Sequence, residues 1–167
     1  MYALGHSPIY YARPGPIHRL TDDRPAKVAQ SEREHYTTRL RAGHGYDDEH
    51  SAAMATLQRA QRSFRNTGGG YWVAEADPIA ARHGMTATVP RDAIAWAVLA
   101  TDGVAEFIDQ ASRGEDWPAL AQLNSDQLAQ VLVRIHDWEA NSDPDARIQP
   151  RAKRHDGKTI VAIPLVK

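Results

Sequence analysis

Two aspartates stand at the ends of the two strongest strand signals, where they could ligate a cation. Asp102 follows the apolar segment 93–100, and Asp156 precedes the apolar segment 159–166. If these strands are antiparallel neighbours, the end of one lies beside the start of the other, so both carboxylates meet at one rim of the sheet. Hard cations such as Mg²⁺ and Mn²⁺ take oxygen ligands and keep several waters. We therefore expect a weak Mg²⁺ or Mn²⁺ site at Asp102 and Asp156. The simpler interpretation is that each Asp-Gly pair makes a turn.

A basic loop precedes the last strand and could bind an acidic or phosphate-bearing partner. Its central residues are Arg151, Arg154 and His155, and arginine binds phosphate with two parallel N–H groups. We interpret these three residues as a candidate phosphate-binding or partner-binding surface. The alternative is a solvated loop without a binding role.

A second group of metal-ligating residue types lies in segment 43–50. It contains His44, Asp47 and His50, with His35 nearby. The alternative interpretation is a junction between two helices, with Asp47 or Asp48 capping the second. Cysteine is absent from the chain, which excludes disulfides, thiolate nucleophiles and cysteine-based zinc sites.

Composition narrows the classes of protein further. The chain has 167 residues and a formal charge of −1, which predicts one domain without the basic face of a nucleic-acid binder. No run approaches the roughly 20 apolar residues of a membrane span. We expect a cytoplasmic protein that binds neither nucleic acid nor membrane.

The elements that must position these residues follow from apolar spacing and turn residues. The pattern predicts an opening β meander with a turn at 13–16, and strands at 71–73, 85–89, 93–100 and 159–166. It predicts helices at 25–40, 48–64, 104–110, 117–123 and 125–140, and a short helix opened by Asp77. The chain begins inside a strand signal, so we expect a domain that lacks leading strands.

Several short motifs occur in a characteristic order around the two aspartates. They are GHSP at 5–8, GGYWVA at 69–74, ADP at 76–78, VLATDGV at 98–104, DPD at 143–145 and RHDGKTI at 154–160. Together they resemble the bacterial branch of the PPM-type (PP2C-like) metal-dependent protein Ser/Thr phosphatases, over about residues 3–167. The resemblance implies that Asp102 and Asp156 are metal ligands.

The chain also departs from the family's pattern. The N-terminal third, which supplies the carboxylates that bridge two metals, has no counterpart here. His6 stands where the family has an aspartate that holds metal-bound water, and Gly157 replaces an Asn or Asp. Loss of the bridge removes both activation of the attacking water and polarisation of the phosphoryl group. The resemblance therefore implies a weak or inactive phosphatase, with its catalytic residues unassigned.

We expect an α+β fold, a truncated PP2C-like sandwich of antiparallel sheets flanked by helices, in a single partial domain over 1–167. An uncovered sheet face or edge recruits partners, which favours a homodimer. The leading hypothesis is a PPM-type phosphatase-like protein. One alternative is a non-catalytic module that engages a phosphoprotein or another protein partner. Another is a reading frame that starts upstream and encodes an active enzyme.

Overall fold

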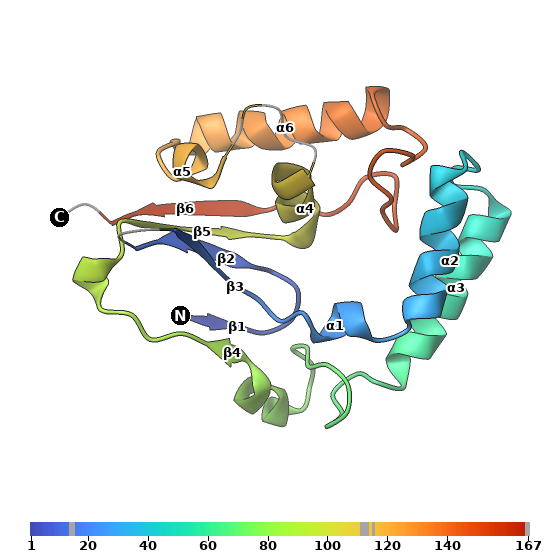
Figure 1. Cartoon of the computed structure of the whole chain (residues 1–167), viewed down its shortest axis with the longest axis horizontal. Coiled ribbons are helices and arrows are strands. Elements are labelled where there is room, and N and C mark those ends of the chain that lie inside the picture. The colour runs from blue at the N-terminus through green and yellow to red at the C-terminus, as the bar shows by residue number, and fades with distance from the viewer. Residues whose placement is uncertain (14–15, 111–113, 115, 166–167) are drawn as a thin grey trace.

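The computed structural model describes residues 1–13, 16–110, 114 and 116–165. It consists of an antiparallel sheet with helices on one face and a small second sheet on the other (Figure 1). A pair of longer helices lies to one side of the sheets (Figure 1). The predicted α+β class with antiparallel sheets and helices is confirmed.

The main sheet has the strand order β3-β2-β5-β6. Its strands are β2 (Ile9–Ala12), β3 (Ile17–Leu20), β5 (Trp96–Ala100) and β6 (Ile160–Pro164), and every neighbouring pair is antiparallel. The predicted turn between β2 and β3 includes Pro14 and Gly15, which lie outside the described residues, as does Val166 at the predicted end of the last strand. β5 pairs directly with β6. The two strands are therefore the antiparallel neighbours that the predicted meeting of Asp102 and Asp156 requires.

The small sheet pairs β1 (Tyr2–Ala3) with β4 (Met85–Thr86). The predicted opening meander is therefore wrong for its first strand, because β1 does not pair with β2. A left-handed turn at Gly5 (φ +83°) separates the two strands. The predicted strand at 71–73 is also wrong, since Tyr71 makes only an isolated bridge to Arg65. These short segments carry little periodicity, so their pairing depends on distant residues.

Three helices cover one face of the main sheet (Figure 1). They are α4 (Asp102–Gln110), α5 (Trp117–Leu120) and α6 (Ser125–Asn141). Their apolar side chains pack on the sheet around the fully buried Val98, Val104 and Ile135. A capping box between Asn124 and Gln127 begins α6, which satisfies backbone N–H groups that the helix leaves unpaired. The predicted helices in this region are confirmed, with shifted ends.

The remaining helices include a pair with its own core, α2 (Gln30–Arg41) and α3 (Asp48–Arg62). The others are the short α1 (Arg24–Lys27) and two 3₁₀ helices at Pro78–His83 and Arg91–Ala93. The predicted helix 25–40 is broken at Ala29, which adopts a left-handed conformation (φ 53°). Leu40 and Leu57 are buried between α2 and α3. None of the described helices combines the length and apolar character needed to cross a bilayer.

Candidate functional site

Hydrogen bonds join the end of β5 to the loop before β6. The Thr101 amide donates to the Thr159 carbonyl at 3.0 Å, and the Thr101 hydroxyl donates to the Gly157 carbonyl at 2.9 Å. The Thr159 amide in turn donates to the Thr101 hydroxyl at 3.1 Å. This network places Asp102 and Asp156, which flank it, at the same rim of the sheet.

Gly103 allows the two aspartate segments to approach closely. A Cβ atom at position 103 would lie 3.0 Å from both the Asp156 Cβ and the Gly157 carbonyl oxygen, closer than side chains normally pack. The Oδ1 atoms of Asp102 and Asp156 each accept the amide of the following glycine. The simpler turn interpretation is therefore realised too, and it engages one oxygen of each carboxylate. The Oδ2 of Asp102 lies 3.9 Å from His6 Nδ1.

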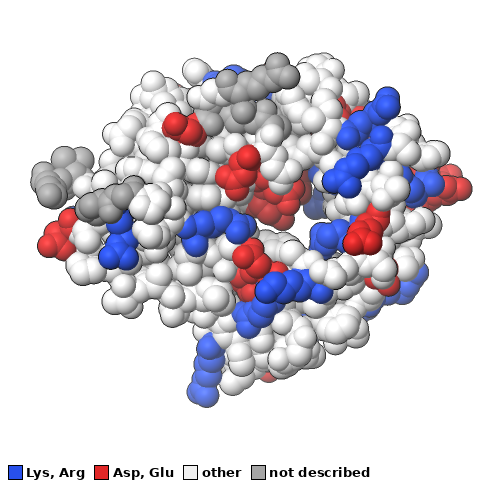
Figure 2. Space-filling model, viewed as in Figure 1, with Lys and Arg blue, Asp and Glu red and all other residues white. Residues whose placement is uncertain are grey.

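Asp102 and Asp156 line one cavity of about 410 Å³. Glu106 of α4 adds a third carboxylate, while Arg33 and Arg41 come from α2. In the space-filling view a hollow right of centre has acidic side chains on its left border and basic side chains on its right (Figure 2). The cavity therefore presents oxygen ligands for a cation opposite groups that bind anions.

Glu106 is the residue that the sequence reading missed. Its side chain reaches the surface, but the cavity encloses it in part. This partial loss of hydration raises the pKa of Glu106 to about 6, and the negative charges of Asp102 and Asp156 add to the effect. The signal was available, because residues four apart lie on one face of a helix. The helix was predicted to begin at Val104, which left Asp102 outside it.

His6 follows the Gly5 turn and enters the same cavity. Partial burial lowers the pKa of its imidazole, and the nearby Asp102 carboxylate only partly opposes this effect. The ring is therefore neutral near pH 7 and can exchange hydrogen bonds with bound water or a ligand.

Arg33 has an unsatisfied donor beside the cavity. One guanidinium nitrogen donates to the Pro25 carbonyl at 3.4 Å, but the buried Nε–H has no partner. Buried N–H groups without partners are rare in native proteins. The Arg33 guanidinium as a whole lines the cavity, where it is placed to pair with an anion.

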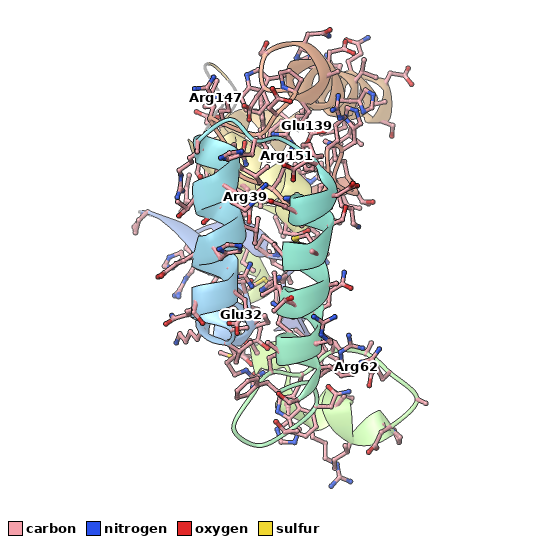
Figure 3. The ribbon with its side chains drawn as sticks, turned by 90° about the vertical axis from the view of Figure 1, so that its right-hand side faces the viewer. Glu32, Arg39, Arg62, Glu139, Arg147 and Arg151 are labelled. Atoms are coloured by element: carbon pink, nitrogen blue, oxygen red, sulfur yellow. The ribbon has the colours of Figure 1, made fainter. Side chains whose placement is uncertain are left out.

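The basic loop is folded against its own acidic residues. Arg151 is only 5% exposed, and all five of its N–H groups are used: they bond to the Asp143 carboxylate and to carbonyls of residues 139, 143, 149 and 154. Arg151 lies beside Glu139 behind the upper ends of α2 and α3 (Figure 3). These bonds give Arg151 a structural role, and its binding role stays a prediction. Arg154 remains exposed, with its guanidinium 5.7 Å from the Tyr46 ring centre, and His155 contacts Glu139.

Segment 43–50 forms the predicted junction between α2 and α3. Asp47 caps α3 by accepting the His50 amide at 2.7 Å, and it also pairs with Arg39. His50 is buried, with its Nε2 3.1 Å from the Ala152 carbonyl. The capping interpretation is confirmed for Asp47.

The donor set of the cavity suits a hard divalent cation, since its ligands are carboxylate oxygens. The carboxylates of the cavity are spread apart. Among the described residues, the His and acidic side chains whose ligand atoms all lie within 4.8 Å of one another are a different group, His136, Glu139 and His155. A cation at Asp102 and Asp156 would keep several waters. Comparison with family models, curated proteins and solved structures finds no match to this chain. The functional assignment therefore depends on the cavity and on the motifs.

Proposed function

We propose that this chain is a PPM-type phosphatase-like protein that binds one Mg²⁺ or Mn²⁺ together with a phosphomonoester, and that it hydrolyses the ester slowly or not at all. The observation that carries the proposal is the shared cavity, in which Asp102 and Asp156 face Arg33. The order of the motifs and the α+β architecture with antiparallel sheets support the same assignment.

Some residues of the cavity would bind the cation, and another would bind the phosphate group. Asp102 and Asp156 supply oxygen ligands, and Glu106 adds negative charge once it ionises above its pKa of about 6. Arg33 lines the same cavity and would offer its guanidinium N–H groups to a phosphate oxygen. A divalent cation bound here would polarise the phosphoryl group. The Arg33 guanidinium would hold the ester from the opposite wall.

Slow turnover follows from the open geometry. Phosphomonoester hydrolysis is among the slowest uncatalysed reactions, so an enzyme needs the full contribution of its metals. A metal pair holds both the attacking and the leaving oxygen, whereas the carboxylates described here do not gather into a compact site. The second candidate function, a non-catalytic module for a phosphoprotein, is favoured by this same observation and would use the same cavity.

Phenyl phosphate and p-nitrophenyl phosphate test the proposal on the whole chain. We expect calorimetry to detect phenyl phosphate binding only when Mn²⁺ is present, with that binding lost in Asp102→Asn and about tenfold weaker in Arg33→Met. Arg59→Met, an exposed arginine of α3 outside the cavity, is the matched control. Binding that needs neither Mn²⁺ nor Asp102 would contradict the proposal. Robust p-nitrophenyl phosphate turnover that depends on Asp102 and Asp156 would instead establish an active phosphatase.

A further inference from the structure

Two imidazoles and a carboxylate meet where α6 faces the loop before β6. His136 and Glu139 are three residues apart and lie on the same face of α6, and His155 approaches them from the loop. The imidazoles of His136 and His155 stack with their centres 4.1 Å apart and their planes at 27°. One ligand atom from each residue lies within 4.8 Å of the other two. The three side chains therefore converge on one point at the surface.

Glu139 is the fixed member of the group. It is 3% exposed, and its Oε2 accepts the Lys158 ammonium at 2.6 Å and lies 3.2 Å from His155 Nδ1. Its Oε1 lies 4.0 Å from Arg151 Nε. Inside the protein a carboxylate needs such cationic partners, because an unpaired buried charge is costly. The site therefore has an oxygen ligand whose position is fixed by contacts from behind.

We propose that His136, Glu139 and His155 bind a divalent transition-metal ion of the Zn²⁺ class. Imidazole suits Zn²⁺, Cu²⁺ and Ni²⁺ better than Mg²⁺ or Mn²⁺. Two histidines and a glutamate are a known zinc donor set that leaves a coordination position for water. The ion would replace the proton that the contact between His155 Nδ1 and Glu139 Oε2 requires.

Small side-chain movements are enough to form the site. Ligands at the usual zinc bond lengths of about 2.0–2.1 Å lie roughly 3.3 Å apart, so the three atoms must draw together from within 4.8 Å. His136 is exposed and His155 is 35% exposed. Both rings can rotate toward Glu139 without disturbing the core.

Substitution of Lys158 tests the proposal, because it should raise the affinity for Zn²⁺. Its ammonium holds the same Glu139 oxygen and repels an incoming cation, so it competes with the metal. Replacing Lys158 with methionine should tighten Zn²⁺ binding, whereas a merely structural contact would give no such gain.

The site is separate from the cavity and has a different donor set, since this group offers two imidazoles where the cavity offers mainly carboxylate oxygens. Substitutions therefore distinguish the two sites: Asp102→Ala removes a ligand of the cavity, whereas His136→Ala removes a ligand of this group. The inference does not depend on the proposed function.

Calorimetric titration of the whole chain with Zn²⁺ tests the proposal, with Co²⁺ absorption in the visible range as a second readout. We expect Zn²⁺ binding at this site to be about tenfold or more weaker in His136→Ala and in His155→Ala, and tighter in Lys158→Met. The exposed His44→Ala is the matched histidine control and should bind as the unchanged chain does. In Asp102→Ala any Zn²⁺ held by the cavity is lost, while binding at His136, Glu139 and His155 remains. Circular dichroism establishes that each variant is folded. Absence of Zn²⁺ binding, or binding unchanged in both His136→Ala and His155→Ala, would overturn the proposal.

Discussion

The pKa of Glu106 depends on the charges of Asp102 and Asp156, because all three side chains line one cavity. Partial loss of hydration inside the cavity is the largest cause of its raised pKa, and the charges of Asp102 and Asp156 add to it. We therefore expect Asp102→Asn and Asp156→Asn each to lower the Glu106 pKa from about 6, as measured by NMR titration of its side-chain carboxyl. The exposed Asp126→Asn on α6 is the control. An unchanged Glu106 pKa in both cavity variants would show that the carboxylates are not close.

The same pKa predicts how stability depends on pH. The folded state holds the Glu106 proton up to about pH 6, whereas the ordinary value is 4.5, so the unchanged chain loses stability as pH rises through this window. Glu106→Gln removes that loss. We expect Glu106→Gln to be the more stable protein above pH 6, by less than ~1 kcal/mol because the side chain is exposed.

Urea unfolding at several pH values measures this difference. The gap between Glu106→Gln and the unchanged chain should close as the pH falls toward 4.5. The exposed Glu34→Gln on α2 is the control and should show no such trend. A gap that widens toward low pH would mean that the sign is wrong.

At the scale of elements, Arg151 connects the end of α6 to the loop before β6. It pairs with Asp143 at 2.9 Å inside the protein and bonds four backbone carbonyls. Removing one partner of a buried ion pair costs about 3–5 kcal/mol. We expect Arg151→Met to lower the free energy of unfolding by that amount, measured in urea. The exposed Arg154→Met should change it by no more than about 0.5 kcal/mol, and equal small effects in the two variants would contradict the structural role of Arg151.

The elements with strong periodicity were predictable from the sequence, and those fixed by distant contacts were not. The apolar spacing in α3, α4 and α6 indicated helices, and the apolar runs indicated β5 and β6. Ala29 breaks a predicted helix although alanine favours helix, and β1 pairs with β4 more than 80 residues away. Local pattern carries no information on either feature.

At the scale of the whole molecule, the residues that line the cavity could not all be predicted from their spacing in the sequence. Asp102 and Asp156 could be brought together from strand order alone. Arg33 could not, because only the tertiary packing of α2 places it opposite α4. The structural role of Arg151 could not be predicted for the same reason, since its buried partners Glu139 and Asp143 lie on and just after α6.

One face of the main sheet leaves apolar side chains exposed. Leu99, Val161 and Ile163 point away from the helices and are 37%, 47% and 40% exposed, and β6 ends the strand order of the described sheet. Exposed apolar patches and unpaired strand edges both recruit partners. We therefore propose that this face, together with the β6 edge, forms the interface of a homodimer.

Sedimentation velocity at several concentrations tests the homodimer. We expect concentration-dependent association that Val161→Lys and Ile163→Lys abolish. Val133→Lys, at an apolar position of α6 that is 58% exposed, is the control and should not affect it. A strict monomer at every concentration would refute self-association.

Binding of Mn²⁺ is the most direct test of the central claim that Asp102 and Asp156 form one cation site. Calorimetric titration of the whole chain should show one weakly bound Mn²⁺, because two carboxylates and water make a sparse site. Asp102→Ala and Asp156→Ala should each abolish this binding, while His136→Ala should leave it intact. Strong Mn²⁺ binding that is unchanged in Asp102→Ala and Asp156→Ala would contradict the claim and place the cation elsewhere.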